Sequence, residues 1–201
     1  ILFDLATKLL ENGTSVEVIT SRRHLFSPVN LESQSMSLLN ALSSKEIPYT
    51  VTANVDGDED LAQRITDKTL GISISGEWIF SKRFISLFDG RFVNIHGTRL
   101  PRNRGGAGFS WMIMMGDRLG GSSVHLVDPG VDTGAVVASN YYSFPQWCRK
   151  PIEYQKFSQE KSLTLLLEFI RDIEAGQYFE AMPQREDLST YWPRLHTGNH
   201  G

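Results

Sequence analysis

The stretch LGISISGEWIFSKRFISLFDGRFVNIH, residues 70–96, decides the fold class. Its two ends, 70–75 and 91–96, are short runs of apolar residues, which predict strands. Between them, SKRFISLF at 81–88 predicts a helix. A strand, a helix and a second strand in immediate succession predict an α/β fold whose strands pair in parallel.

The same alternation continues on both sides of this stretch. Toward the N-terminus we expect helices at 4–13, 33–47 and 58–67 and strands at 15–20 and 48–52, with Asp4 as a cap and Gly13 as a stop signal for the first helix. We therefore predict a mostly parallel, twisted sheet with helices on both faces. A helix that begins near Asp4 leaves only residues 1–3 in front of it, so we expect the first strand of the sheet to be missing from this sequence.

Toward the C-terminus the glycines at 105–106 are typical of the start of a helix, and 122–128 and 134–142 predict two further strands. The segment 162–176 predicts a helix that lies across the sheet, because five apolar residues share one of its faces: Leu163, Leu166, Leu167, Ile170 and Ile173. After it the chain is irregular and aromatic. We expect a catalytic domain over 1–180 and an irregular connector over 181–201 that leads toward a C-terminal region not present.

Composition limits the class of protein. The chain has 201 residues, 40% of them hydrophobic and 21% charged, which is ordinary for a globular domain. Cys148 is the only cysteine, which excludes a disulfide or a CxxC zinc site within the chain and favours a reducing, cytoplasmic setting. A net charge of -3 argues against nucleic acid as the main partner. No apolar run approaches the roughly 18 residues of a membrane span, and we expect no membrane contact.

The candidate site begins with Asn94 and His96 in the predicted strand 91–96. Residues two apart in a strand share a face, so Ile95 points into the opposite layer. The pair lies at the carboxyl end of the strand, where open α/β sheets bind ligands. A carboxamide and an imidazole there can donate hydrogen bonds to a developing oxyanion, and histidine can move a proton. The alternative is that Asn94 and His96 are structural residues of the strand.

A carboxylate could set the charge state of the histidine. HLVDPGVDTG offers Asp128 and Asp132, and we expect Asp132 to approach His96, raise its pKa and stabilise the imidazolium. The alternative is ordinary turn chemistry at Asp-Thr-Gly. With no serine or cysteine nucleophile, this set suits transfer between two bound substrates. We expect His125 to be a packed or edge histidine and no metal site to be present.

The combined pattern resembles the folate-dependent formyltransferases, a family that includes methionyl-tRNA, glycinamide ribonucleotide and sugar-nucleotide N-formyltransferases. The resemblance is strong over 70–137 and is carried by NIHGTRLPRNRGG and VDPGVDTGAVV, with Asn94, His96, Leu100, Pro101, Gly105, Asp132 and Gly134 in matching places. It implies a Rossmann-like formyltransferase fold, a catalytic trio of Asn94, His96 and Asp132, 10-formyltetrahydrofolate as donor and an amine as acceptor. Asn94 and a protonated His96 would stabilise the oxyanion, and Asp132 would orient His96 and help to move the proton.

The resemblance also implies a pterin pocket between two segments, made by Gly76, Trp78, Ile79 and Phe80 on one side and by Leu126, Val127, Asp128 and Val131 on the other. Core packing is the alternative for Trp78 and Phe80. The chain departs from the family at Thr98, where serine is common, and at Ser81, where proline is usual.

The acceptor implied most closely is the amino group of a nucleotide-linked amino sugar, used for lipopolysaccharide and other surface polysaccharides. Four residues that follow Asn94 and His96 are candidates to bind the diphosphate of this nucleotide: Thr98, Arg99, Arg102 and Arg104. The alternative for the arginines is a solvated loop. Other functions remain open: methionyl-tRNA formyltransferase-type activity, hydrolysis of formyl-folate, or a non-catalytic folate-binding domain. The expected partners are small molecules, without nucleic acid, and a homodimer is compatible with the sequence.

Overall fold

The computed structural model describes residues 1–30, 35–76, 78–106 and 108–193. Helices and strands alternate along the first part of the chain, which contains α1 (Leu2–Glu11), β1 (Val18–Thr20), α2 (Arg22–Leu25), β2 (Pro28–Asn30), β3 (Ser35–Ser37), α3 (Leu38–Ser44), β4 (Tyr49–Val51), a 3-10 turn at Val55–Gly57, α4 (Glu59–Arg64), β5 (Gly71–Ser73) and α5 (Lys82–Ser86). The second part contains β6 (Phe92–His96), β7 (Arg104–Gly105), α6 (Gly108–Met114), β8 (Leu119–Leu126), β9 (Val136–Ser143), α7 (Pro151–Glu174), a 3-10 turn at Glu186–Leu188 and β10 (Tyr191–Trp192).

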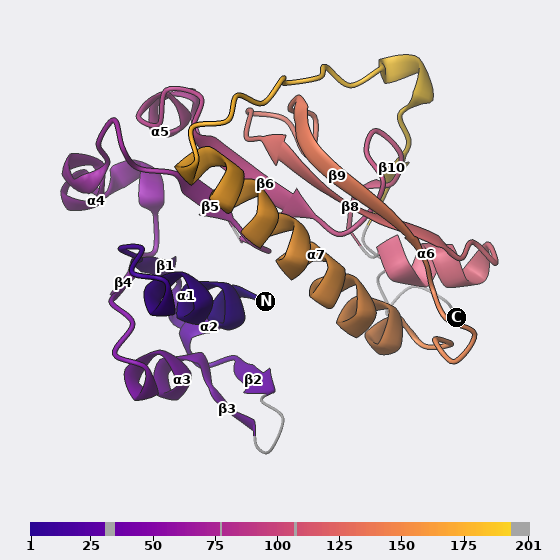
Figure 1. Ribbon diagram of the computed structural model, residues 1–201, viewed down its shortest axis with the longest axis horizontal. Helices are drawn as coiled ribbons and strands as arrows, with labels where there is room; N and C mark the ends of the chain where they lie inside the picture. The colour runs from indigo at the N-terminus through magenta and orange to yellow at the C-terminus, as the bar shows by residue number, and fades with distance from the viewer. Residues whose placement is uncertain (31–34, 77, 107, 194–201) are drawn as a thin grey trace.

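The central sheet has four strands in the order β5-β6-β8-β9 (Figure 1). β5 and β6 are parallel, as are β1 and β4, which form a separate two-stranded sheet. These pairs confirm the predicted α/β fold with parallel strands. β8 is antiparallel to both β6 and β9, and the short connection from β8 to β9, 127–135, returns the chain directly.

Helices cover both faces of the sheet. On one face, α7 packs its Leu166 and Phe169 against Val93 and Ile95 of β6. On the other face, Phe84 of α5 meets Phe92 of β6, with ring centroids 6.0 Å apart. Alternate residues of β6 therefore enter two different apolar clusters, as strand geometry requires.

α7 is longer than the sequence analysis predicts. It begins at Pro151 rather than near residue 162 and runs for 24 residues diagonally across the sheet (Figure 1). The carboxylate of Glu153 accepts the backbone N–H groups of Arg149 and Lys150 and so satisfies donors just before the helix. The apolar pattern of the sequence does not predict the first half of α7, because the buried side chains there include the hydroxyl residues Ser158 and Ser162.

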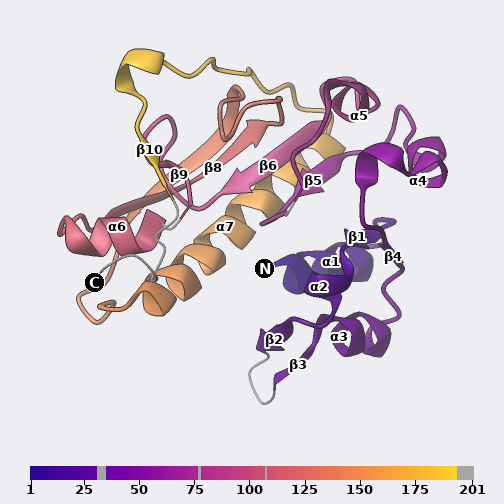
Figure 2. The same ribbon diagram turned by 180° about the vertical axis from the view of Figure 1, so that it is seen from behind.

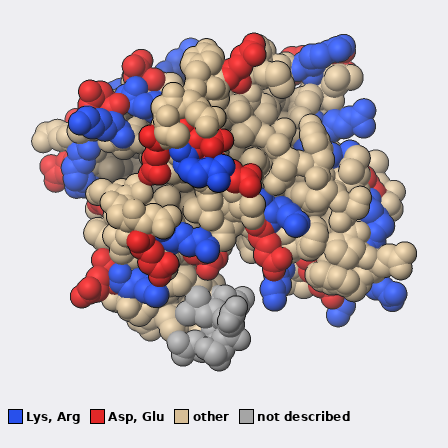
Figure 3. Space-filling view, in the orientation of Figure 1, with Lys and Arg blue, Asp and Glu red and all other residues tan. Residues whose placement is uncertain are grey.

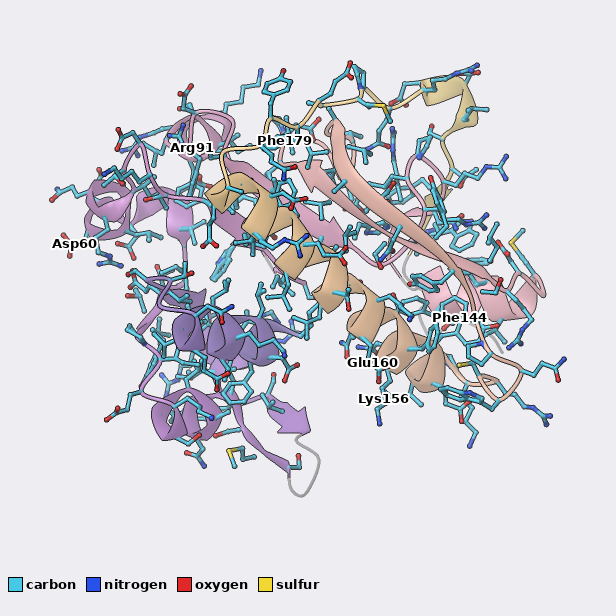
Figure 4. All side chains as sticks on the ribbon, viewed as in Figure 1. Asp60, Arg91, Phe144, Lys156, Glu160 and Phe179 are labelled. Carbon is cyan, nitrogen blue, oxygen red and sulfur yellow. The ribbon has the colours of Figure 1, made fainter. Side chains whose placement is uncertain are left out.

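Aromatic side chains attach both ends of α7 to the rest of the molecule (Figure 4). Near its beginning Tyr154 stacks on Phe144, with ring centroids 3.9 Å apart. Near its end Phe169 meets Phe179, at 5.2 Å. At the start of the chain, α1 begins at Leu2 with no side-chain cap, so Asp4 lies in the first turn instead of capping it.

The segment predicted as an irregular connector folds back onto the molecule. Its described part contains the 3-10 turn at Glu186–Leu188 and β10, which pairs in parallel with β7. Figure 2 shows this segment, in yellow, running from the end of α7 back toward α6. Residues 194–201 lie outside the described part of the chain.

The surface carries both signs of charge. Acidic and basic side chains are interspersed over the face shown in Figure 3. Among the described residues, no helix is both long and apolar enough to cross a membrane.

Candidate functional site

Asn94 and His96 lie on the face of β6 that is not covered by α7. Val93 and Ile95 between and beside them are buried in the cluster beneath α7, whereas Asn94 and His96 are partly exposed. Phe92, two residues before Asn94, packs on the same face with Phe84 and Phe88, and we term these three residues and their apolar neighbours the phenylalanine cluster. The site is therefore bordered by apolar surface on the side where β6 begins.

His96 faces an oxygen atom on each of two opposite sides of its ring. Nε2 lies 2.8 Å from the Asn103 carbonyl, and Nδ1 lies 3.5 Å from Oδ2 of Asp132. A carbonyl oxygen can only accept a hydrogen bond, so Nε2 carries a proton. Nδ1 is then the nitrogen that can gain or lose a proton, and it faces a carboxylate.

Burial sets the direction in which the pKa of His96 moves. Removal from water lowers the pKa of the His96 imidazole, and the charge of Asp132 and the Asn103 carbonyl oppose this effect without overcoming it. The predicted rise in the pKa of His96, with a stabilised imidazolium, is wrong because the local sequence does not show how deeply the ring is buried. His96 is therefore neutral at pH 7.

Asp132 remains ionised although its side chain is only 15% exposed. Burial would raise its pKa, but the neighbouring His125 and His96 side chains and the Gly105 N–H together hold the pKa of this carboxyl below its ordinary value. The Gly105 N–H donates to Oδ2 at 2.9 Å. The aspartate thus supplies a fixed negative charge beside the titrating nitrogen of His96.

His125 is a fourth member of the group that the sequence analysis did not select. It is 3% exposed, its Nδ1 donates to the Leu126 carbonyl at 2.8 Å, and its Nε2 lies 3.0 Å from Nδ2 of Asn94. Nδ2 of Asn94 can only donate, so Nε2 of His125 accepts this hydrogen bond and fixes which way the Asn94 amide points. The signal that reveals His125 is the register of the sheet, which sets it directly opposite Asn94.

The residues expected to form a pterin pocket divide into two groups. Trp78, Phe80 and Val127 are partly buried in the phenylalanine cluster, and Trp78 Nε1 donates to the Ala53 carbonyl at 3.2 Å. Ile79 and Val131 are 79% and 48% exposed, which leaves two apolar side chains open to a ligand. Trp78, Phe80 and Val127 thus support the two loops from inside the fold, and Ile79 and Val131 are the side chains that could contact a flat ring.

The remaining pocket candidates shape the loop that carries Asp132. Oδ1 of Asp128 accepts the Gly130 N–H and the Thr133 hydroxyl, at 3.1 and 2.6 Å. The Leu126 carbonyl is occupied by His125. Gly134 is required because a Cβ there would overlap that same carbonyl. Gly76 is exposed.

Three of the four predicted acceptor contacts are occupied within the fold. Thr98 is buried and donates to the Asn103 carbonyl, and Arg99 pairs with Asp117. Arg104 is buried against Gln184 and Glu186, which lie 80 and 82 residues away along the chain. Arg102 alone of the four is exposed. The expectation that Thr98, Arg99 and Arg104 face a diphosphate is thus corrected by their internal partners.

Within the described residues, no group of three or more histidine, cysteine, aspartate or glutamate side chains is arranged to hold a metal ion. The chemistry that the site supports is acid–base transfer. An oriented amide donor, a neutral imidazole and an ionised carboxylate lie together on one strand face and the loop beside it. Such a set can stabilise negative charge on an oxygen and move one proton.

Comparison with known proteins agrees with this chemistry. The family model described as formyl transferase matches residues 3–145. The methionyl-tRNA formyltransferase of Finegoldia magna is 27% identical over 139 residues, which cover 68% of this chain and 42% of that protein. That of a Synechocystis species is 32% identical over 107 residues, 53% of this chain and 32% of that protein. The chain therefore spans less than half the length of these curated relatives.

Solved structures share the fold. One is the sugar 3N-formyl transferase WlaRD, crystallised in the presence of dTDP and 5-N-formyl-THF. Another is an N-formyltransferase from Helicobacter canadensis in complex with folinic acid and dTDP-3-aminofucose. Each has a TM-score of 0.75 and 18% identity, over 96% of this chain and 66% of the other.

Proposed function

The chain belongs to the formyl transferase family, and from this membership we propose that it transfers a formyl group from 10-formyltetrahydrofolate to a primary amine. The observation that carries the proposal is the arrangement of Asn94, His96 and Asp132. His96 Nε2 is fixed by the Asn103 carbonyl, and Nδ1 is left beside the Asp132 carboxylate.

The residues around the site fit a folate donor. Exposed Ile79 and Val131 offer apolar contacts for a flat pterin ring, and the aromatic cluster containing Trp78 and Phe80 supports the first of these loops. When bound, 10-formyltetrahydrofolate supplies the formyl group for transfer. No metal is needed by this scheme, since the side chains themselves supply the hydrogen-bond donor and the base.

The side chains divide the work. Asn94, whose amide is oriented by His125, donates a hydrogen bond to the oxygen that gains negative charge. Neutral His96 accepts a proton from the amine at Nδ1 and later returns it to the leaving nitrogen. Asp132 stabilises the imidazolium that forms in between. One preorganised donor of this kind typically contributes about 100- to 1,000-fold in rate, and one acid–base group about 100- to 10,000-fold.

For the acceptor we propose the amino group of a nucleotide-linked amino sugar. This is supported by the fold neighbours crystallised with dTDP or a dTDP-linked amino sugar. The second candidate is methionyl-tRNA, which is favoured by the names of the curated relatives. The single cysteine, a buried free thiol, suits a reducing compartment, so we extend the proposal to a cytoplasmic step in the synthesis of surface polysaccharides such as lipopolysaccharide.

The donor site is tested by calorimetric titration of the 201-residue chain with 5-formyltetrahydrofolate, an unreactive analogue of the donor. We expect saturable one-to-one binding that is weakened at least about tenfold by Ile79→Asp, because a carboxylate replaces an apolar contact. Ile152→Asp is the matched control, since Ile152 is similarly exposed at the start of α7. No binding by the folded chain, or equal loss in both variants, would contradict the donor site.

The reaction is tested by mixing enzyme and 10-formyltetrahydrofolate with a dTDP-linked amino sugar or with methionyl-tRNA. We expect formylation of the sugar, and a loss of at least about 100-fold in kcat for Asn94→Ala and for His96→Ala. Binding of 5-formyltetrahydrofolate by both variants shows that they are folded. Formylation of tRNA alone would select the second candidate, and release of formate without an amine would indicate a hydrolase.

A further inference from the structure

The segment 182–192, which we term the C-terminal strap, crosses two loops of the site. At its beginning Met182 exchanges backbone hydrogen bonds of 2.8 and 2.9 Å with Val136, just after the Asp132 loop. At its end the Trp192 carbonyl accepts the Gly106 N–H at 3.0 Å, beside the turn that follows His96. Figure 2 shows the strap passing from one end of the sheet to β10.

Gln184, near the beginning of the strap, links the two loops through one side chain. Its Nε2 donates to the carbonyls of Asp132 and Gly134, at 2.9 and 2.7 Å. Its Oε1 accepts from Nε and Nη2 of Arg104, at 3.1 and 2.9 Å. Both amide N–H groups of Gln184 therefore bind the loop that carries Asp132, and its amide oxygen binds Arg104 in the turn that follows His96.

The ion pair between Arg104 and Glu186, beside Gln184, neutralises the positive charge of Arg104. Glu186 accepts from Nη1 and Nη2 of Arg104 at 3.0 and 2.8 Å. Arg104 can then serve as a buried, neutralised attachment point next to the site, instead of a free cation that would change the charge balance at Asp132.

Thr190 holds the second loop. Its Oγ1 accepts the Asn103 N–H at 2.8 Å, and its carbonyl accepts the Arg104 N–H at 2.9 Å. Asn103 has a left-handed φ of 63°, a conformation that a non-glycine residue adopts only with support. The Asn103 carbonyl is the acceptor that fixes His96 Nε2. The strap thus orients the imidazole from one side and the carboxylate from the other.

We propose that Gln184 is a positioning residue that sets the separation between the Asp132 carboxylate and His96 Nδ1. It does not touch the reacting atoms. It acts by fixing the backbone on both sides of Thr133, and hence the approach of the carboxylate to the ring. This inference rests on the proposed function for its effect on rate, but its effect on the His96–Asp132 pair is independent of any substrate.

Two neutral substitutions remove the link. Gln184→Leu and Gln184→Met each remove all four hydrogen bonds and add no charge beside the His96–Asp132 pair. Gln177→Leu is the matched control, because Gln177 is exposed in the same part of the chain and has no side-chain hydrogen bond within the described residues. Circular dichroism and 5-formyltetrahydrofolate binding establish folding, and the Met variant alone carries the test if the Leu variant does not fold.

The decisive measurement is the pKa of the His96 ring, followed by NMR in the free protein. The charge of Asp132 raises this pKa, so a carboxylate that moves away lets it fall further. We expect a downward shift of at least about half a unit in both Gln184 variants and none in Gln177→Leu. An unchanged pKa in a folded Gln184 variant would overturn the proposal.

Kinetics supply the second readout. With the amine acceptor that the wild type uses, we expect kcat to fall by about 10- to 100-fold in both Gln184 variants while KM for the donor stays constant, since a displaced catalytic group affects the chemical step. A rise in KM with constant kcat would contradict positioning. If the wild type formylates no acceptor, the proposed function fails, yet the NMR titration still decides the role of Gln184.

Discussion

At the scale of single residues, the two nitrogens of His96 have different tasks. Nε2 is committed to the Asn103 carbonyl, and Nδ1 faces Asp132. Burial lowers the pKa of the ring, and the aspartate charge partly restores it. The base form of His96 is therefore the form present at neutral pH, and protonation on the acid side removes it.

Replacement Asp132→Asn tests this balance. Since the carboxylate raises the pKa of His96, its loss moves the acid limb of kcat/KM to lower pH, while the rate at pH 7 falls by roughly 100-fold because the imidazolium loses its counter-charge. In the wild type the acid limb of the pH–rate profile already lies below about pH 6.5, which is the ordinary pKa of histidine. Full pH–rate profiles measure both effects, with Asp172→Asn as a surface control. A limb that stays in place or moves upward would refute the assignment.

At the scale of elements, the short β7–β10 pair depends on Gly105. This residue has a φ of 90°, and a Cβ there would lie 2.5 Å from the Trp192 carbonyl and 2.7 Å from the Tyr191 ring. Only glycine lets β10 approach β7 so closely. The same glycine donates its N–H to Asp132, so the close approach of two strands and the placement of the carboxylate share one residue.

Gly105→Ala should therefore destabilise more than an alanine at another left-handed glycine. Gly90 has a φ of 78° and open space around its Cβ position, so Gly90→Ala measures the conformational cost alone, about 1 to 2 kcal/mol. We expect Gly105→Ala to exceed it by at least about 1 kcal/mol, because the added methyl group also displaces β10. Urea denaturation of both variants gives the difference. Equal decreases in the free energy of unfolding would mean that β10 can move away from β7 without destabilising the fold.

At the scale of the whole molecule, the strand that carries the site is also the strand that anchors the core. Val93 and Ile95 pack beneath α7 with Leu165, Leu166 and Phe169. Asn94 and His96 alternate with them on the opposite face. The packing of α7 thus holds the backbone of β6, from which the proposed catalytic side chains Asn94 and His96 project.

Leu166→Ala should destabilise the whole fold. Leu166 is fully buried, and truncation of such a leucine typically costs about 2 to 5 kcal/mol through lost burial and the cavity left behind. Leu163→Ala is the control, because Leu163 lies one turn earlier on α7 and is only partly buried. The free energies of unfolding in urea should differ by at least about 1 kcal/mol. Similar values would show that α7 is not packed as described.

Several features of this protein follow from the sequence by itself. Strands and helices alternate visibly from residue 48 to 96, because periods of two and 3.6 are encoded within a few neighbouring residues. The predicted helix at 33–47 is partly wrong, because Ser35–Ser37 form strand β3 and the helix begins only at Leu38. The same period of two places Asn94 and His96 on one face. The spaced motifs around Asn94 and Asp132 are specific enough to indicate the formyl transferase family, which the match over residues 3–145 confirms.

Other features were decided only by the tertiary structure. His125 joins Asn94 through the register of β6 and β8, and Arg104 is buried by Gln184 and Glu186 from the strap. The pKa of His96 falls because the ring is removed from water, although its acidic neighbour alone predicts a rise. Pairing between distant segments and the depth of burial depend on how the whole chain packs, and a local sequence pattern carries no record of either.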